Sequence, residues 1–323
     1  MERRMKELIQ QAFDFGIDYA RKNAQKDHEF RALDFVRMYQ DSDIYDNYYM
    51  TSAFALTSLP HKKPKDDTKW VQQNGPFHLL VEGGYKLVDG EPVFSGVPYG
   101  SRARLILYYL VTKAVERQTP KVQLGRSMTA WMKSMKIPAS GPNYETIREQ
   151  VMRLASCRIT FNQTTSVGSA MAQENIVGAM FTPRADGEQV WEDCAVLSEG
   201  FFEALRSHKF PVDARAISVL QNQSQSMDVY IWLCYRMQKV DSAMLVPWKS
   251  LYQQFGSGYS ALRYFKRNFL RDVLPRAMAV YPKVMIEIDD ANGIILHPSP
   301  PAIDFVKTYK GGAFKSIDGD QKP

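Results

Sequence analysis

The sequence predicts an α+β protein in which one succession of elements occurs twice. Apolar residues at helical spacing alternate with short strand-like runs, and strongly apolar helical segments occur near residues 101–118 and 226–240. Each of these segments is followed by signals for a strand, two helices and a strand pair. At 323 residues, the chain is long enough for two ordinary domains and an extension. We therefore expect a helical extension (1–53), a first domain (54–208), a second domain (209–303) and a tail (304–323).

The first forty residues are expected to form two helices. Leu8, Ala12, Phe15 and Tyr19 roughly share one face of the first helix. The polar segment "SLPHKKPKDDTKW" predicts a loop. "FHLLVEGGYKLVDGEPVFSGVPYG" has short apolar runs broken by Gly-Gly and Asp-Gly, which predicts a strand pair with tight turns.

In the first domain, "SRARLILYYLVTKAVERQ" predicts a helix that is buried almost all round. "KVQLG" reads as a strand, and "SMTAWMKSMKI" as a helix that begins after Ser127 as N-cap. "NYETIREQVMRLASC" predicts the next helix. "RITFNQTT" and "NIVGAMFTP" are expected to be strands around a polar loop, followed by a strand in "VWEDCAVLS" and a short helix in "EGFFEALRSH".

The second domain repeats that order. "SMDVYIWLCYRMQKV" is a buried helix, "AMLVPW" a strand, and "KSLYQQFG" a short helix with Gly256 at its C-cap. "YSALRYFKRNFLRDVLPRAMAV" predicts one longer helix, and "KVMIEIDDANGIILHPSP" a β-hairpin. A buried helix, a strand, two helices and a hairpin are the elements of a winged-helix domain. In such a domain, the second helix of the helix-turn-helix enters the DNA major groove.

The helix after Ser260 carries the candidate site. Its projection places Leu262, Phe265, Phe269 and Val273 on one face and a cationic row on the other, with Lys266 nearby. The cationic face holds Ser260, Arg263, Tyr264, Arg267, Asn268 and Arg271. Arginine can pair with guanine and asparagine with adenine, while other members of the row would contact phosphates. A solvated cationic face and a groove for an acidic partner helix are the alternatives.

The corresponding helix of the first domain is less suited to reading bases, because Glu145 and Glu149 on its outward face would repel phosphates. We expect this domain either to contact the DNA backbone or to mediate dimerisation; its candidate backbone contacts are Arg148, Arg153 and Arg158. In the second domain, Lys283 and the hairpin turn are expected along the backbone.

Several classes of activity lack their motifs. The five histidines never come within two residues of each other, no Walker loop occurs, and the three cysteines are scattered. We therefore expect no enzymatic activity, cofactor or metal. No run of eighteen apolar residues and no signal-peptide core occur, which predicts a cytoplasmic protein without a membrane span. The net charge of +6 is compatible with a polyanionic partner.

Several segments also resemble a known family. "PYGSRARLILYYLVTKAV", "LGRSMTAWMKSMKIPASG", "REQVMRLASCRITF", "FPVDARAISVLQ", "VPWKSLYQQFGSGYSALRYFKRNFLRDVLPRAMAVYP" and "LHPSPP" are similar to RepA-type replication initiators of bacterial plasmids. The resemblance runs from about residue 54 to residue 301.

This resemblance implies a tandem winged-helix protein that binds repeated double-stranded sites (iterons) in a plasmid origin. It further implies that the protein opens the adjacent duplex, and that its partners are the host initiator ATPase and the replicative helicase. Dimers would repress the protein's own gene and thereby contribute to copy control, while monomers would initiate replication. A winged-helix transcriptional regulator with no replication role is the alternative.

Overall fold

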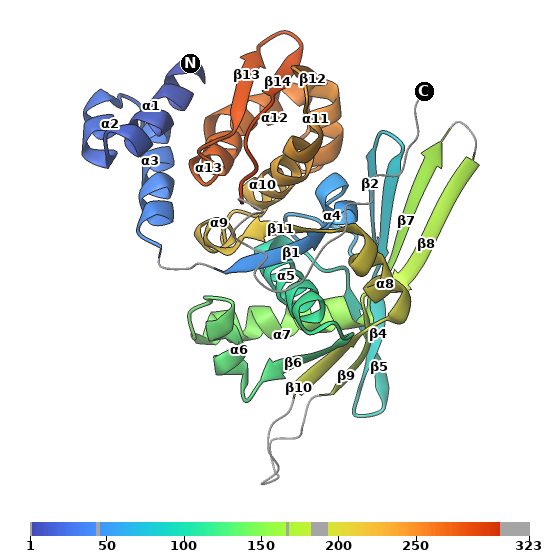
Figure 1. Cartoon of the computed structure of the whole chain (residues 1–323). Helices are drawn as coiled ribbons and strands as arrows, with labels where there is room; N and C mark the ends of the chain where they lie inside the picture. The colour runs from blue at the N-terminus through green and yellow to red at the C-terminus, as the bar shows by residue number, and fades with distance from the viewer. Residues whose placement is uncertain (1, 43–45, 166–167, 182–192, 304–323) are drawn as a thin grey trace.

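Helices and sheets occur along the whole described chain, which confirms the predicted mixture of α and β structure (Figure 1). The computed structural model describes residues 2–42, 46–165, 168–181 and 193–303. Within these ranges, no helix is both long and apolar enough to cross a membrane.

The first forty residues, which the structure describes from residue 2 on, contain three helices rather than the two expected: α1 (Glu2–Asp14), α2 (Ile17–Asn23) and α3 (Asp27–Gln40). Gly16 separates α1 from α2 with a φ of 91°, a conformation that glycine adopts easily. The expected shared face is therefore interrupted. Leu8 and Ala12 are buried, whereas Phe15 and Tyr19 are exposed.

The next segment supplies strands for three of the sheets: β1 (Asn47–Thr51), helix α4 (Ser52–Leu56), β2 (Lys69–Asn74), β3 (Phe77–Glu82), β4 (Gly84–Val88) and β5 (Glu91–Gly96). The hairpin β4–β5 confirms the expected strand pair. Its turn contains Asp89 and Gly90 with φ of 52° and 88°, the positive values that tight hairpin turns require.

The helices of the first repeat lie where the sequence predicts them. They and the strand between them are α5 (Gly100–Arg117), β6 (Lys121–Gly125), α6 (Met128–Ser134) and α7 (Gly141–Ser156). The hydroxyl of Ser127 accepts a hydrogen bond from the Ala130 amide at 3.1 Å, so Ser127 is the N-cap.

The prediction of a polar loop after residue 165 is wrong, because residues 168–175 form a strand. The elements of this part of the chain are β7 (Arg158–Thr165), β8 (Gly168–Asn175), β9 (Val177–Phe181), β10 (Asp193–Leu197) and helix α8 (Glu199–His208). Strand β8 pairs with β7 along its whole length and completes the sheet β2-β3-β7-β8. Small and polar residues have weak strand preference on their own, but a neighbouring strand supplies the hydrogen bonds that override it.

The second half begins with a strand and two helices, β11 (Lys209–Asp213), α9 (Ala214–Val219) and α10 (Ser224–Arg236), then the short 3₁₀ turn η1 (Met237–Lys239). The repeat continues with β12 (Met244–Pro247), α11 (Trp248–Phe255), α12 (Leu262–Asn268), η2 (Phe269–Val273), α13 (Leu274–Ala279), β13 (Met285–Asp289) and β14 (Gly293–His297).

The one long helix expected after Ser260 is interrupted, because η2 is a π-helical turn. Pro275 explains its position. A proline has no amide hydrogen and its ring clashes with the carbonyl four residues earlier, which here belongs to Arg271. The wider turn relieves this clash, so residues after Asn268 do not follow the spacing of a uniform α-helix.

Two three-stranded sheets share one topology. Their strand orders are β6-β10-β9 and β12-β14-β13, so in each the strand after the buried helix pairs with the last strand of the repeat. The predicted recurrence of element order thus extends to strand pairing. In the first repeat β10 is the central strand and β9 is the outer strand that corresponds to β13, and β7–β8 is an inserted hairpin.

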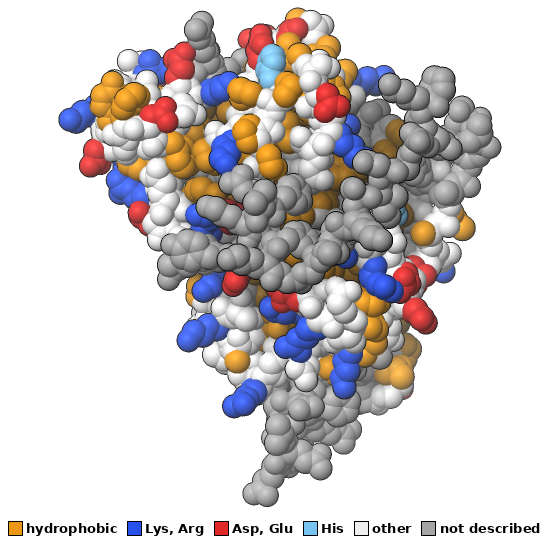
Figure 2. All heavy atoms as spheres, in the orientation of Figure 1, with side chains coloured by type: hydrophobic (Ala, Val, Ile, Leu, Met, Phe, Trp, Pro, Cys, Tyr) orange, Lys and Arg blue, Asp and Glu red, His pale blue; other side chains and the backbone are white. Residues whose placement is uncertain are grey.

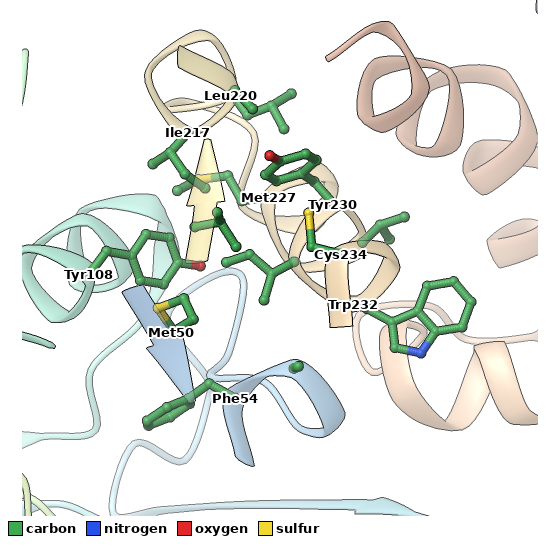
Figure 3. Packing of buried hydrophobic residues seen from close by; sticks show 14 of the residues in the cluster. Met50, Phe54, Tyr108, Ile217, Leu220, Met227, Tyr230, Trp232 and Cys234 are labelled. Atoms are coloured by element: carbon green, nitrogen blue, oxygen red, sulfur yellow. The ribbon is translucent and has the colours of Figure 1, made fainter. Parts of the chain in front are cut away.

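The two halves are joined by strands and by a common core. Strand β1 pairs with β11 in antiparallel register, from Asn47 with Asp213 to Thr51 with Lys209. Figure 3 shows side chains from β1, α4, α5 and α10 packed together, among them Met50 and Tyr108.

A buried ion pair crosses the same junction. The Arg104 guanidinium of α5 donates to both carboxylate oxygens of Asp228 on α10, each at 2.7 Å. Both side chains are buried, and Arg104 also donates to the carbonyls of Leu59 and Pro60. The junction therefore contains a satisfied charge network as well as apolar contacts.

Candidate nucleic-acid interface

Aromatic rings hold α12 in place against α11. The Phe265 and Phe269 rings are fully buried and lie 5.1 Å apart, and Trp248 of α11 packs edge-on against Phe269 at 6.3 Å. The expected apolar face is confirmed for Phe265, Phe269 and Val273, whereas Leu262 at the start of α12 is 39% exposed. The packed rings orient the opposite face of the helix toward solvent.

That opposite face presents two arginines around one tyrosine. The Arg263 guanidinium lies 4.7 Å from the centre of the Tyr264 ring and donates to its hydroxyl at 3.0 Å, while Arg267 lies 5.6 Å from the same ring. Among the described residues, neither arginine has a carboxylate within ion-pair distance. We call Arg263 and Arg267 the exposed pair; stacking restrains their side chains and leaves most of their N–H donors available.

The polar residues next to the exposed pair have surroundings that differ from those that the sequence predicts. Ser260 is exposed but precedes the first turn of α12. The Asn268 amide donates to the Tyr259 hydroxyl at 2.5 Å, and its oxygen accepts from Arg271 at 3.4 Å. Tyr259 in turn donates to Gln225 of α10, so the Asn268 side chain contributes to anchoring α12.

Arg271 differs from the exposed pair because it has an ionic partner. Its Nε lies 2.6 Å from Asp272, a largely buried carboxylate that also faces Arg31 at 3.3 Å and Arg276 at 3.5 Å. Arg31 belongs to α3, so Asp272 joins the N-terminal extension to η2. In the part of the chain that the structure describes, the row of three similar arginines is thus two arginines without carboxylate partners and a third that is partly neutralised.

Lys266 anchors the hairpin rather than extending the exposed pair. Its ammonium forms an ion pair with Asp290 at 3.1 Å and lies 4.8 Å from the Trp248 ring. The Trp248 indole donates to the carbonyl of Asp289 at 3.0 Å. The tip of β13–β14 is thereby fastened to both helices. Lys283 is exposed in the turn before β13, at the opposite end of that strand from the tip.

The first repeat offers fewer available arginines than expected. Arg153 is 5% exposed; it pairs with Glu149 at 2.9 Å and Asp67 at 3.1 Å, and stacks on Tyr99. The prediction that Arg153 contacts phosphates is therefore wrong, because its charge is buried and satisfied internally.

The other two candidates of the first repeat remain on the surface. Arg158 is half-exposed, but its guanidinium makes two 2.8 Å hydrogen bonds to Glu82 across the β3–β7 pair. Arg148 is exposed, and no carboxylate of the described chain lies within ion-pair distance of it. Of the three predicted contacts, Arg148 is the one that has no carboxylate partner among the described residues.

A cationic segment of the first repeat was missed by the sequence reasoning. No Asp or Glu occurs between residues 117 and 144, and the basic side chains of this interval are all exposed; they are Arg117, Lys121, Arg126, Lys133 and Lys136. Figure 2 shows Lys and Arg side chains over the region of α6 and β6. The gap in acidic residues is a signal that could have been read from the sequence.

Residues 97–248 match the family described as "Plasmid encoded RepA protein" (RepA_C). This segment is of the RepA type. The match confirms the resemblance to RepA and covers the chain from just before α5 to the first residue of α11. The helix α12 with its exposed pair lies outside the RepA_C segment.

No curated protein has a significant sequence match to this chain. Two crystal structures of domains 2 and 3 of RctB are similar in structure. One, a selenomethionine derivative, is 12% identical, covers 79% of this chain and 100% of its own, and has a TM-score of 0.49. The other is 14% identical, covers 75% and 93%, and has a TM-score of 0.46.

Proposed function

We propose that this protein is a plasmid replication initiator that binds double-stranded origin DNA through α12. The RepA_C segment supports the initiator role. The observation that carries DNA binding is the exposed pair, two arginines without a carboxylate partner among the described residues, held by Tyr264 on a rigid helix.

In this proposal the elements from α10 to β14 act as a winged-helix unit. Helix α11 braces α12, which enters the major groove with Arg263 and Arg267 toward guanine edges. Arg271, Ser260 and Lys283 would contact the DNA backbone, since phosphate contacts position a protein without reading sequence. Lys266 and Asn268 would contribute by holding the helix and the hairpin.

The first repeat, as a second winged-helix unit, would contact the backbone through Arg148 and the cationic segment, or mediate dimerisation. Opening of the adjacent duplex, recruitment of a host helicase and ATPase, and repression of the protein's own gene complete the initiator proposal. We propose a binding role rather than catalysis. A protein that acts on plasmid DNA in this way would work in the bacterial cytoplasm.

The test compares specific with random DNA. We expect Arg263→Ala and Arg267→Ala to weaken binding to the cognate origin repeat by about 1–3 kcal/mol each, with a smaller effect on random duplex. Arg206→Ala is the matched control, because Arg206 is an exposed arginine of α8. Equal losses on both DNAs would show that the exposed pair contacts phosphates only.

A transcriptional regulator would pass this binding test, so a second assay is needed. Supercoiled origin plasmid incubated with the protein should become reactive to a probe of unpaired thymines beside the repeats. Binding without that reactivity would favour the regulator. Metal-dependent nicking of the same plasmid would contradict the non-catalytic role.

A further inference from the structure

A groove separates the hairpin β13–β14 from the N-terminal helices. Its walls are α1 with the first turn of α3 on one side and the hairpin on the other, and α12, η2 and α13 form its floor. We call it the hairpin groove. Its volume of about 940 Å³ is at the upper end of ordinary ligand cavities.

The floor of the hairpin groove is apolar. The floor contributes Leu270, Leu274 and Met278 from η2 and α13, and the adjoining hairpin wall contributes Ile286 and Ile288 from β13. Leu270 and Ile288 are partly exposed, and the other three are buried. Apolar surface of this kind is stabilised when apolar side chains of a ligand cover it, and hydrated phosphates cannot do so.

Two carboxylates line the groove, and each has a polar partner. Asp290 pairs with Lys266 at 3.1 Å, and Glu287 lies 3.1 Å from the His297 ring nitrogen. The charge of Asp290 is therefore offset by Lys266.

The basic side chains at the groove are less well neutralised. Lys6 of α1 and Arg267 of α12 line it, and neither has a carboxylate within ion-pair distance among the residues that the structure describes. Arg271, which shares Asp272 with two other arginines, and His28 also line it. A net cationic rim above an apolar floor is complementary to a ligand that is both apolar and acidic.

We propose that the hairpin groove docks an acidic amphipathic helix of a partner protein. The apolar face of that helix would cover Leu270 and Ile288, and its carboxylates would meet Lys6 and Arg267. Such helices bind grooves through apolar residues at positions i, i+3, i+4 and i+7. Because Arg267 also belongs to the exposed pair of the proposed DNA interface, partner and DNA would weaken each other's binding reciprocally.

The experiment uses the full chain and a designed, fluorescently labelled helix of about 16 residues, with leucine at those positions and glutamate elsewhere. Binding is measured by fluorescence anisotropy. A scrambled peptide of the same composition and a peptide with lysine in place of glutamate are the controls. We expect the glutamate peptide to bind about tenfold more tightly than either control.

Two variants separate this proposal from the proposed function. Lys6→Glu should weaken peptide binding about tenfold and leave binding to the origin repeat unchanged, because Lys6 lies on α1. Arg263→Ala should weaken DNA binding and leave peptide binding unchanged, because Arg263 does not line the groove. Lys22→Glu on α2, an exposed lysine outside the groove, is the matched control.

Equal binding of the scrambled peptide, or equal binding by Lys6→Glu and the unaltered protein, would overturn the docking proposal. Sedimentation velocity of the same proteins without peptide tests a second copy as the occupant. If Lys6→Glu dissociated a self-associated form, the groove would be an interface between copies, and the partner-helix proposal would be wrong.

Discussion

At the residue scale, arginines that look alike in the sequence have different surroundings. Arg263 stacks on an adjacent tyrosine, whereas Arg153 is buried with Asp67, a residue 86 positions away. Helical spacing predicted the face of each side chain but could not show which carboxylates the fold brings to it. A cationic row predicted from one helix is therefore an upper limit on the charge available to a ligand.

Arg153 and Arg148 provide a test on one helix. We expect Arg153→Ala to lower the free energy of unfolding by about 2–3 kcal/mol, because it removes the hydrogen bonds that the Asp67 carboxylate and the Val97 carbonyl accept from a buried guanidinium. Arg148→Ala, on the exposed face, should change it by less than about 0.5 kcal/mol. Urea denaturation of both variants measures this; similar losses would contradict the assignment of Arg153 to the interior.

His61 predicts a pH dependence of stability. Its ring lies near Arg104, Ser224 and Asp228, and burial together with the Arg104 charge holds its pKa well below the ordinary 6.5. The unfolded chain thus binds a proton below about pH 6.5 that the folded chain does not, so stability falls as pH decreases, by at most about 1.4 kcal/mol per pH unit.

The His61→Gln variant isolates this contribution, because glutamine does not titrate. We expect the free energy of unfolding of the unaltered protein, minus that of the variant, to be highest near pH 8 and to decrease toward pH 5.5. Urea denaturation at several pH values measures it. A difference that stays constant with pH would show that His61 is protonated equally in both states.

At the element scale, strand pairing and one proline changed the predicted pattern. Strand β8 forms because β7 lies beside it, although its own residues read as a loop. Pro275 could have been recognised in the sequence as a break inside the longest helix of the second repeat. What the sequence could not show is that the chain would respond with a π-helical turn rather than a kink.

The hairpin position depends on Gly293. A Cβ at this residue would meet the Val246 carbonyl and Pro247 of β12 within 3 Å. We expect Gly293→Ala to destabilise the protein by about 1–3 kcal/mol and to weaken DNA binding, because the hairpin must move. Gly258→Ala, where a Cβ would meet no atom within 4 Å, is the matched control for thermal unfolding and DNA binding. Unchanged unfolding of Gly293→Ala would contradict the close approach of β14 to β12.

At the scale of the whole molecule, the two halves depend on each other. Cutting the chain after His208 would separate β1 from β11 and Arg104 from Asp228. We expect a 1–208 fragment to aggregate or lack cooperative unfolding, since an unpaired buried charge costs several kcal/mol. Circular dichroism and light scattering measure this, with a 1–303 chain as the control; a stable 1–208 fragment would show that the first half folds alone.

The sequence by itself determined most helices, the repeated order of elements, the aromatic face of α12 and the family resemblance, because these depend on residues close together in the chain. The tertiary structure decided which arginines are accessible, where β8 pairs and how the N-terminal helices form a groove beside the hairpin. Those features depend on contacts between residues far apart in sequence, and local periodicity carries no information about such contacts.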